Sequence, residues 1–285
     1  MERCGLSALL EQVIQLVHEV GDQVVMPRFL KVARQHKGDG SVLTEADLAA
    51  QEALQRGLAT IIDCPLVGEE MTPQAQQKAW DEGHAANGRG VWCVDPIDGT
   101  LNFASGLPQF AISVAYIADK KPQFGVVYAP ALGETFYAQA GQGAFLQKNG
   151  QPTVSLPHSQ QGLNTSADLA EAVAIVDFKR LPQALAQALV THPPYHSQRN
   201  FGAATLDWCY LAAGRCDLYL HGGQMLWDYA AASLILQEAQ GCMTTLDARV
   251  PFWQGDRWHS SVVAARNPVL FQTWKGWLEN LSSSR

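Results

Sequence analysis

The stretch from residue 111 to residue 147 constrains the fold of this chain more than any other. Four short runs rich in β-branched and aromatic residues follow one another there, separated by Gly, Pro or a charged turn. The runs span residues 112–118, 124–128, 135–138 and 144–147. Connections this short join antiparallel neighbours, because parallel strands need a crossover of a dozen or more residues. The pattern therefore predicts an antiparallel meander.

Helical patterns lie on both sides of this meander. Apolar residues recur at helical spacing over residues 6–32, and a second helix is predicted to begin at Thr44, where Thr44-Glu45-Ala46-Asp47 has the pattern of a capping box. Further elements are predicted after the meander, with helices at residues 181–189, 205–213 and 227–239 and a strand at 217–220.

Helices and antiparallel strands that occur in separate blocks favour a layered α+β fold. We expect one domain over residues 1–285, with an N-terminal lobe of about residues 1–150 and a C-terminal lobe of about residues 165–285.

Composition and charge exclude several classes of protein. Hydrophobic residues make up 47% of the chain and charged residues 16%, which excludes a disordered protein. The net charge is −7 and no basic run occurs, so we expect no direct binding to nucleic acid. Six cysteines without a C-x-x-C pair indicate reduced thiols and a cytoplasmic location. No apolar stretch approaches the roughly 20 residues of a membrane span, so no membrane partner is expected.

The strongest chemical signal is Asp95-Pro96-Ile97-Asp98-Gly99-Thr100, which follows the apolar run Val91–Val94. Pro96 holds Asp95 extended and forces a turn that brings Asp98 back towards it. Two converging carboxylates suit Mg²⁺, whereas zinc would require Cys or His. A second run, residues 65–68, also ends in acids, Glu69-Glu70. The alternative interpretation is an ordinary β-turn with Asx hydrogen bonds.

These motifs resemble those of the inositol monophosphatase family, which comprises Mg²⁺-dependent, lithium-sensitive phosphomonoesterases. The resemblance covers residues 37–241 and rests on four segments: Lys37 to Asp47, Gly68-Glu69-Glu70, Trp92 to Phe103, and Trp227-Asp228-Tyr229-Ala230-Ala231 running to Glu238-Ala239. It implies an α/β/α/β/α sandwich of the inositol monophosphatase and fructose-1,6-bisphosphatase type. It also implies a homodimer that acts on a small phosphorylated substrate.

The resemblance further implies a metal site with two Mg²⁺ ions and a weaker third position. The implied ligands are the side chains of Glu69, Asp95, Asp98 and Asp228 and the carbonyl group of Ile97. Thr100, backed by Asp47, would orient the attacking water, with Glu69 also in the catalytic set. Gly99 and Thr100 would contact the phosphate, and Asp228 would also border the substrate.

Several of these residues have plainer interpretations. Asp228 has the position of an acid that stabilises the start of a helix, and Asp47 that of a capping-box acid. Glu70 is either a supporting acceptor or a solvent-facing side chain. Arg199 matches a family arginine near the substrate but is otherwise a surface charge.

The substrate is less constrained than the metal site. Inositol-preferring members carry a Glu seven residues before the last metal Asp, whereas this chain has His221 there, which puts inositol in doubt. His221 is either a hydroxyl-binding residue or a histidine satisfied at a strand end.

Two groups of alternatives therefore remain open. The first is a phosphatase for histidinol phosphate, nucleotide bisphosphates, sugar bisphosphates or NADP. The second is a regulatory protein of the same fold that docks to the transcription machinery, against which the complete ligand set argues.

Overall fold

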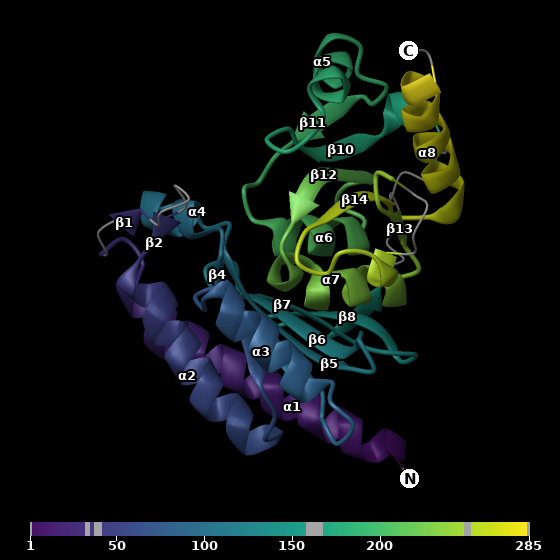
Figure 1. The fold of residues 1–285 in the computed structure, drawn as a ribbon. Coiled ribbons are helices and arrows are strands. Elements are labelled where there is room, and N and C mark those ends of the chain that lie inside the picture. The colour runs from purple at the N-terminus through teal and green to yellow at the C-terminus, as the bar shows by residue number, and fades with distance from the viewer. Residues whose placement is uncertain (1, 32–34, 37–41, 158–167, 248–251, 284–285) are drawn as a thin grey trace.

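Two large β-sheets alternate with three helical layers in the described part of this protein (Figure 1). The computed structural model describes residues 2–31, 35–36, 42–157, 168–247 and 252–283. The order of layers is that of the expected α/β/α/β/α sandwich, and the α+β fold class is confirmed.

The first sheet contains the predicted meander and has the strand order β3-β4-β5-β6-β7-β8-β9. Only the pair β3 and β4 is parallel, and each later pair is antiparallel. The strands are β3 (Leu66–Gly68), β4 (Val91–Asp98), β5 (Ala111–Ala118), β6 (Lys121–Ala129), β7 (Glu134–Gln139), β8 (Gly143–Lys148) and β9 (Val154–Leu156). Strand β4 runs four residues beyond the predicted end at Val94, so Asp95 to Asp98 of the acidic motif are part of the strand.

Two long helices cover the outer face of this sheet (Figure 1). They are α1 (Glu2–Val20), extended by the turns η1 (Gly21–Val25) and η2 (Met26–Arg28), and α2 (Glu45–Ile61). The α-helix predicted over residues 6–32 thus ends at Val20. Val13 and Val17 of α1 and Leu54 of α2 are fully buried in one cluster with Trp92 of the sheet. The predicted capping box is confirmed, because the Thr44 N–H donates to Asp47 Oδ2 at 2.7 Å.

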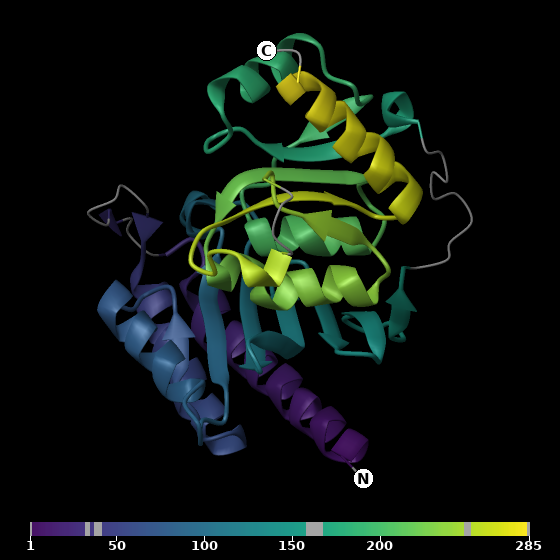
Figure 2. The same cartoon turned by 45° about the vertical axis from the view of Figure 1, so that its right-hand side comes forward.

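The second sheet is mixed, with the order β11-β10-β12-β14-β13. Its strands are β10 (Val173–Asp177), β11 (Ser197–Arg199), β12 (Leu218–Gln224), β13 (Cys242–Thr244) and β14 (Ser260–Ala265). Only β12 corresponds to a strand predicted from the sequence. Helices α5 (Gln183–Thr191) and α8 (Pro268–Ser283) lie on its outer face (Figure 2).

Helices α6 (Ala204–Ala212) and α7 (Leu226–Glu238) form the layer between the two sheets. Helix α7 lies very close to the first sheet, since a Cβ atom placed on Gly125 of β6 would be 2.6 Å from Ala231 Cα. This contact brings the start of α7 next to the end of β4. The remaining elements are α3 (Pro73–Gly83), α4 (Thr100–Ser105), β1 (Gln35–His36), β2 (Val42–Leu43), η3 (Leu169–Glu171) and η4 (Phe252–Gln254).

None of the described helices combines the length and the apolar character that a membrane span requires.

Candidate active site

The acidic motif lies at the carboxyl end of β4, where the pairing with β5 becomes irregular between Asp95 and Asp98. Asp95 is 1% exposed and its Oδ1 accepts the N–H of Ile97 at 3.1 Å. The irregularity lets both carboxylates point to one side, because a regular strand would place residues three apart on opposite faces. The predicted convergence of Asp95 and Asp98 is therefore present in the structure.

Asp98 is held by the N-terminus of α6. Its Oδ1 accepts the Ala204 N–H at 3.2 Å, and its Oδ2 accepts the Thr205 N–H at 2.7 Å as well as the Thr205 hydroxyl. The first amides of a helix have no partner within the helix and favour an anion. Burial raises the pKa of Asp98 to about 6, although the hydrogen bonds from Thr205 oppose the shift.

Asp228 completes the acidic cluster from the first turn of α7. Its Oδ2 accepts the Met225 N–H at 2.8 Å, so the side chain caps the helix as the plainer interpretation expected. It also faces the end of β4. Carboxylate oxygens of Asp95, Asp98 and Asp228 lie within 4.8 Å of one another. We refer to these three residues as the acidic cluster.

The electrostatics of the acidic cluster favour a cation. Burial, followed by the negative charges of Glu69, Asp98 and Asp228, raises the pKa of Asp95 well above its usual range. Burial and the charge of Asp98 do the same for Asp228. Among the described residues no Lys or Arg forms an ion pair with the cluster. Like charges about 4 Å apart repel by roughly 4 kcal/mol at an effective dielectric of 20, so all-oxygen ligands of this kind fit a hard divalent ion.

Thr100 links the acidic motif to α2. Its hydroxyl lies 2.9 Å from the Ile97 carbonyl oxygen and 3.1 Å from Asp47 Oδ1. Asp47 is fully buried, and its Oδ2 accepts the Thr44 hydroxyl at 2.6 Å. Burial raises the pKa of Asp47, against the lowering effect of the hydrogen bonds from Thr44 and Thr100. Asp47 is thus both the predicted capping acid and a neighbour of Thr100.

Glu69 follows β3 and lies beside the acidic cluster. Its N–H donates to the Val94 carbonyl at 3.2 Å, and its charge contributes to the raised pKa of Asp95, Asp98 and Asp228. The Glu70 N–H donates to Gln51 Oε1 at 3.1 Å, which ties this turn to α2.

Gly99 has a left-handed backbone with φ of 81°, and a Cβ atom there would lie 2.9 Å from the Gln109 carbonyl oxygen. We expect Gly99→Ala to lower the free energy of unfolding by more than the roughly 1–3 kcal/mol typical of such a conformation, because the methyl group also meets backbone. Denaturant unfolding measures this difference. Gly141→Ala is the matched control, since Gly141 has φ of 72° with nothing within 4 Å. Equal losses in the two variants would contradict the expectation.

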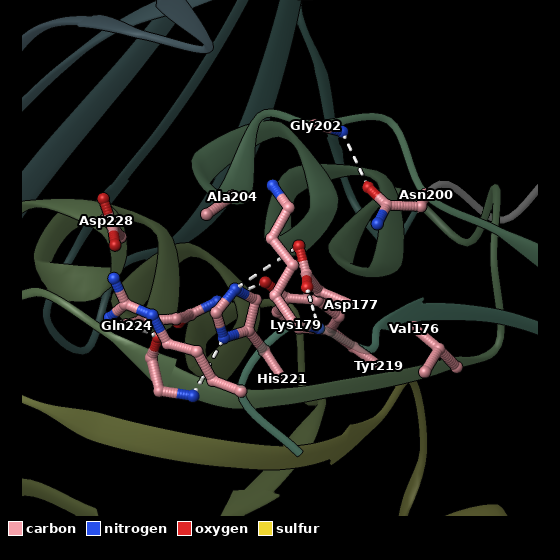
Figure 3. Close-up of polar contacts among 12 residues, drawn as sticks. Val176, Asp177, Lys179, Asn200, Gly202, Ala204, Tyr219, His221, Gln224 and Asp228 are labelled. Carbon is pink, nitrogen blue, oxygen red and sulfur yellow. Dashed lines mark hydrogen bonds and ion pairs between the residues drawn. The ribbon is translucent and has the colours of Figure 1, made fainter. Parts of the chain in front are cut away.

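His221 uses both ring nitrogens within the protein (Figure 3). Nδ1 accepts the Gly223 N–H at 3.0 Å, which leaves the proton of the neutral ring on Nε2, 3.8 Å from Asp177 Oδ2. Burial lowers the pKa of His221 to about 4, so the ring is neutral at pH 7. This arrangement agrees with a histidine satisfied at a strand end, and Asp177 is the acid beside it.

Arg199 is exposed at the end of β11. Its Nη1 donates to Ser197 Oγ at 2.7 Å and to the Gln198 carbonyl at 2.9 Å. These contacts lie along its own strand. The segment from Lys37 to Ser41, which contributes to the resemblance, lies outside the described residues.

A family model described as the inositol monophosphatase family matches residues 6–282. The chain belongs to this family. The resemblance seen in the motifs is therefore confirmed over nearly the whole chain.

Three relatives illustrate the range of the inositol monophosphatase family. A fructose-1,6-bisphosphatase/inositol-1-monophosphatase of Thermotoga maritima is 35% identical over 178 residues, which are 59% of this chain and 62% of that protein. A 3'(2'),5'-bisphosphate nucleotidase CysQ of Aggregatibacter actinomycetemcomitans is 30% identical over 84% of this chain and 85% of its own length. The solved structure of an IMPase from Thermotoga maritima covers the entire chain and 99% of its own length, with 26% identity and a TM-score of 0.76.

Two polar residues of this family member position the site although sequence reasoning did not select them. Thr205 binds Asp98, as described above. Asn102 of α4 donates through Nδ2 to the carbonyls of Gln109 and Phe201, each at 2.7 Å. Asn102 thus joins the helix after the acidic motif to the loop that leads into α6. The contacts of Thr205 with Asp98 and of Asn102 with Phe201 each span about a hundred residues of sequence, and no local pattern signals them.

Proposed function

We propose that this member of the inositol monophosphatase family is a Mg²⁺-dependent phosphomonoesterase. One observation carries the proposal: the buried carboxylates of Asp95 and Asp98 and the partly buried one of Asp228 converge where the family model and the motifs coincide, and Asp98 and Asp228 raise the pKa of Asp95. The side chains of Asp95, Asp98, Asp228 and Glu69 and the Ile97 carbonyl would hold the metal, with two ions and a weaker third position. When bound, Mg²⁺ supplies positive charge that lowers the pKa of water and stabilises the leaving oxygen.

The residues around the cluster take separate roles in this proposal. The Thr100 hydroxyl, fixed by Asp47, orients the attacking water. Glu69, which lies beside the acidic cluster, also belongs to the catalytic set. Gly99 and Thr100 would contact the phosphate, because the backbone at Gly99 carries no side chain there. The neutral His221 and its neighbour Asp177 would border the alcohol portion of the substrate. Arg199 remains a candidate at the edge of that pocket.

The substrate proposed is a small phosphorylated alcohol. Inositol monophosphate is the reference substrate of the family, but a neutral imidazole stands where a carboxylate would accept inositol hydroxyls. We further propose a cytoplasmic homodimer that binds no nucleic acid directly.

The test of this function is phosphate release from p-nitrophenyl phosphate with Mg²⁺ and with excess chelator. We expect release only with Mg²⁺ and inhibition by tens of millimolar Li⁺ at limiting Mg²⁺. A panel of inositol 1-phosphate, histidinol phosphate, sugar bisphosphates, nucleotide bisphosphates and NADP then ranks substrates. Absence of release from every ester would refute the enzyme and favour a protein that acts by docking.

Mg²⁺ is also expected to stabilise the fold, because it offsets repulsion among buried carboxylates. Ligand at about 100 times its Kd adds roughly 2.7 kcal/mol, which corresponds to about 5–10 °C in Tm for a domain near this size. Thermal unfolding with Mg²⁺ and with chelator measures the shift. K⁺ at equal ionic strength is the control, and an equal shift with K⁺ would show general screening instead of a site.

A further inference from the structure

A basic wall stands beside the acidic cluster on the C-terminal lobe. It consists of Lys179 and Arg180, in the loop between β10 and α5, and His259, just before β14. All three side chains are exposed. Arg180 Nη1 donates to the Gly223 carbonyl at 3.2 Å and lies 3.1 Å from His259 Nε2. Gly223 belongs to β12, the strand that carries His221, so this hydrogen bond holds the guanidinium group of Arg180 against that strand.

The positive charges of this wall affect the pKa values of His221 and Asp228. The positive charges of Arg180 and Lys179 each act to lower the pKa of His221, and that of Arg180 also acts to lower the pKa of Asp228. The Lys179 side chain extends past Asp177 towards Ala204, the residue whose N–H binds Asp98 (Figure 3). The basic wall and the acidic cluster therefore face the same space.

Two glycines fix the wall against β12. A Cβ atom on Gly222 would overlap the backbone of Arg180, and one on Gly223 would overlap the ring of His259. The loop of Lys179 and Arg180 and the ring of His259 thus pack directly on the strand that carries His221. Close packing limits how far the Arg180 backbone can move, which preorganises its guanidinium group for a ligand.

The positive charge of the wall is not neutralised within the described part of the chain. No carboxylate there forms an ion pair with Lys179 or Arg180. Asp177 precedes Lys179 by two residues, accepts the Lys179 N–H at 2.8 Å and lies 3.8 Å from His221 Nε2. Exposed cations that no carboxylate neutralises favour an anionic ligand.

We infer that the substrate carries a second phosphate group, which Arg180, Lys179 and His259 bind while the acidic cluster serves the phosphate that is cleaved. This inference rests on the proposed function and names its substrate class. Three donors of different geometry match the several oxygens and nearly double charge of a phosphate better than a planar carboxylate with one charge. A neutral polyol would leave both cations unpaired.

The test compares kcat/KM for two matched pairs: fructose 1,6-bisphosphate with fructose 1-phosphate, and adenosine 3',5'-bisphosphate with adenosine 3'-monophosphate. We expect wild type to prefer at least one bisphosphate, and Arg180→Gln to lower kcat/KM for it by about 10- to 150-fold. Phosphate release from p-nitrophenyl phosphate should stay within about threefold, because that ester has no second anion. Lys179→Gln should act in the same direction with a smaller effect, since an ammonium group is a single point charge.

Two further arms make the result decisive. Lys275→Gln removes a partly exposed charge from α8, where it pairs with Glu279, and should leave all ratios unchanged. The pair 2-phosphoglycerate and glycerol 2-phosphate tests a carboxylate, and a preference for this acid with none for a bisphosphate would overturn the inference. An unchanged bisphosphate preference in Arg180→Gln would overturn it as well.

Calorimetric titration of the Mg²⁺-loaded protein with adenosine 3',5'-bisphosphate separates this inference from the proposed function. Weaker binding by Arg180→Gln supports the second phosphate site even if no ester is cleaved. Equal Kd values for wild type and Arg180→Gln would reject it even if the protein is an active phosphatase.

Discussion

Asp95→Asn is expected to abolish Mg²⁺-dependent phosphate release while leaving the protein folded. Asp95 has the central position in the acidic cluster, because Glu69, Asp98 and Asp228 all raise its pKa. An amide at this position keeps the size and the hydrogen bond from the Ile97 N–H but removes the charge that a cation requires. Phosphate release at saturating Mg²⁺ should therefore equal the chelator background.

Thermal unfolding separates this effect from damage to the fold. The metal-free Asp95→Asn protein should be at least as stable as metal-free wild type, since one of several mutually repelling carboxylates has been removed. Its Tm should no longer rise with Mg²⁺. Activity within tenfold of wild type, together with a preserved Tm increase, would show that Asp95 holds no essential ion.

Thr100→Val is expected to lower kcat by roughly 10²- to 10⁴-fold, the usual contribution of a positioned proton-transfer group. Valine has nearly the shape of threonine but lacks the hydroxyl that lies between Asp47 Oδ1 and the Ile97 carbonyl. The loss should appear in kcat at saturating Mg²⁺, because the carboxylates remain. Steady-state kinetics on p-nitrophenyl phosphate measures it.

Thr100→Ser is the matched control, since it restores the hydroxyl without the methyl group. We expect it to recover most of the activity. If serine and valine variants lose activity equally, the methyl packing of Thr100 matters and the hydroxyl does not orient water.

The features of the fold that sequence predicts are those set by local patterns. The capping box at Thr44 and Asp47 uses residues three apart, and the meander uses short turns, so both are visible in the sequence. The second sheet was mostly missed because its partners are distant. Strand β11 has three residues and pairs with β10, and β14 pairs with β12 some forty residues earlier. Such short strands carry little periodicity of their own.

The residues of the site also fall into two groups, those that a local pattern predicts and those whose position depends on distant contacts. The proximity of Asp95 and Asp98 follows from the motif itself, through Pro96 and the turn. Asp228 was indicated only through the resemblance, because its position depends on how closely α7 packs on the first sheet. Thr205 and Arg180 were not predicted, since each acquires its position from a contact with a distant strand or helix.

The acidic cluster also affects motion, because its hydrogen-bond donors come from separate layers. The amides of Ile97 in β4, Thr205 in α6 and Met225 before α7 each donate to one carboxylate of the acidic cluster. Local opening of any one of these segments breaks its hydrogen bond to a carboxylate that a bound cation would hold in place. One ion at this point would therefore slow amide hydrogen exchange in both halves of the protein together, far beyond the few residues that bind it.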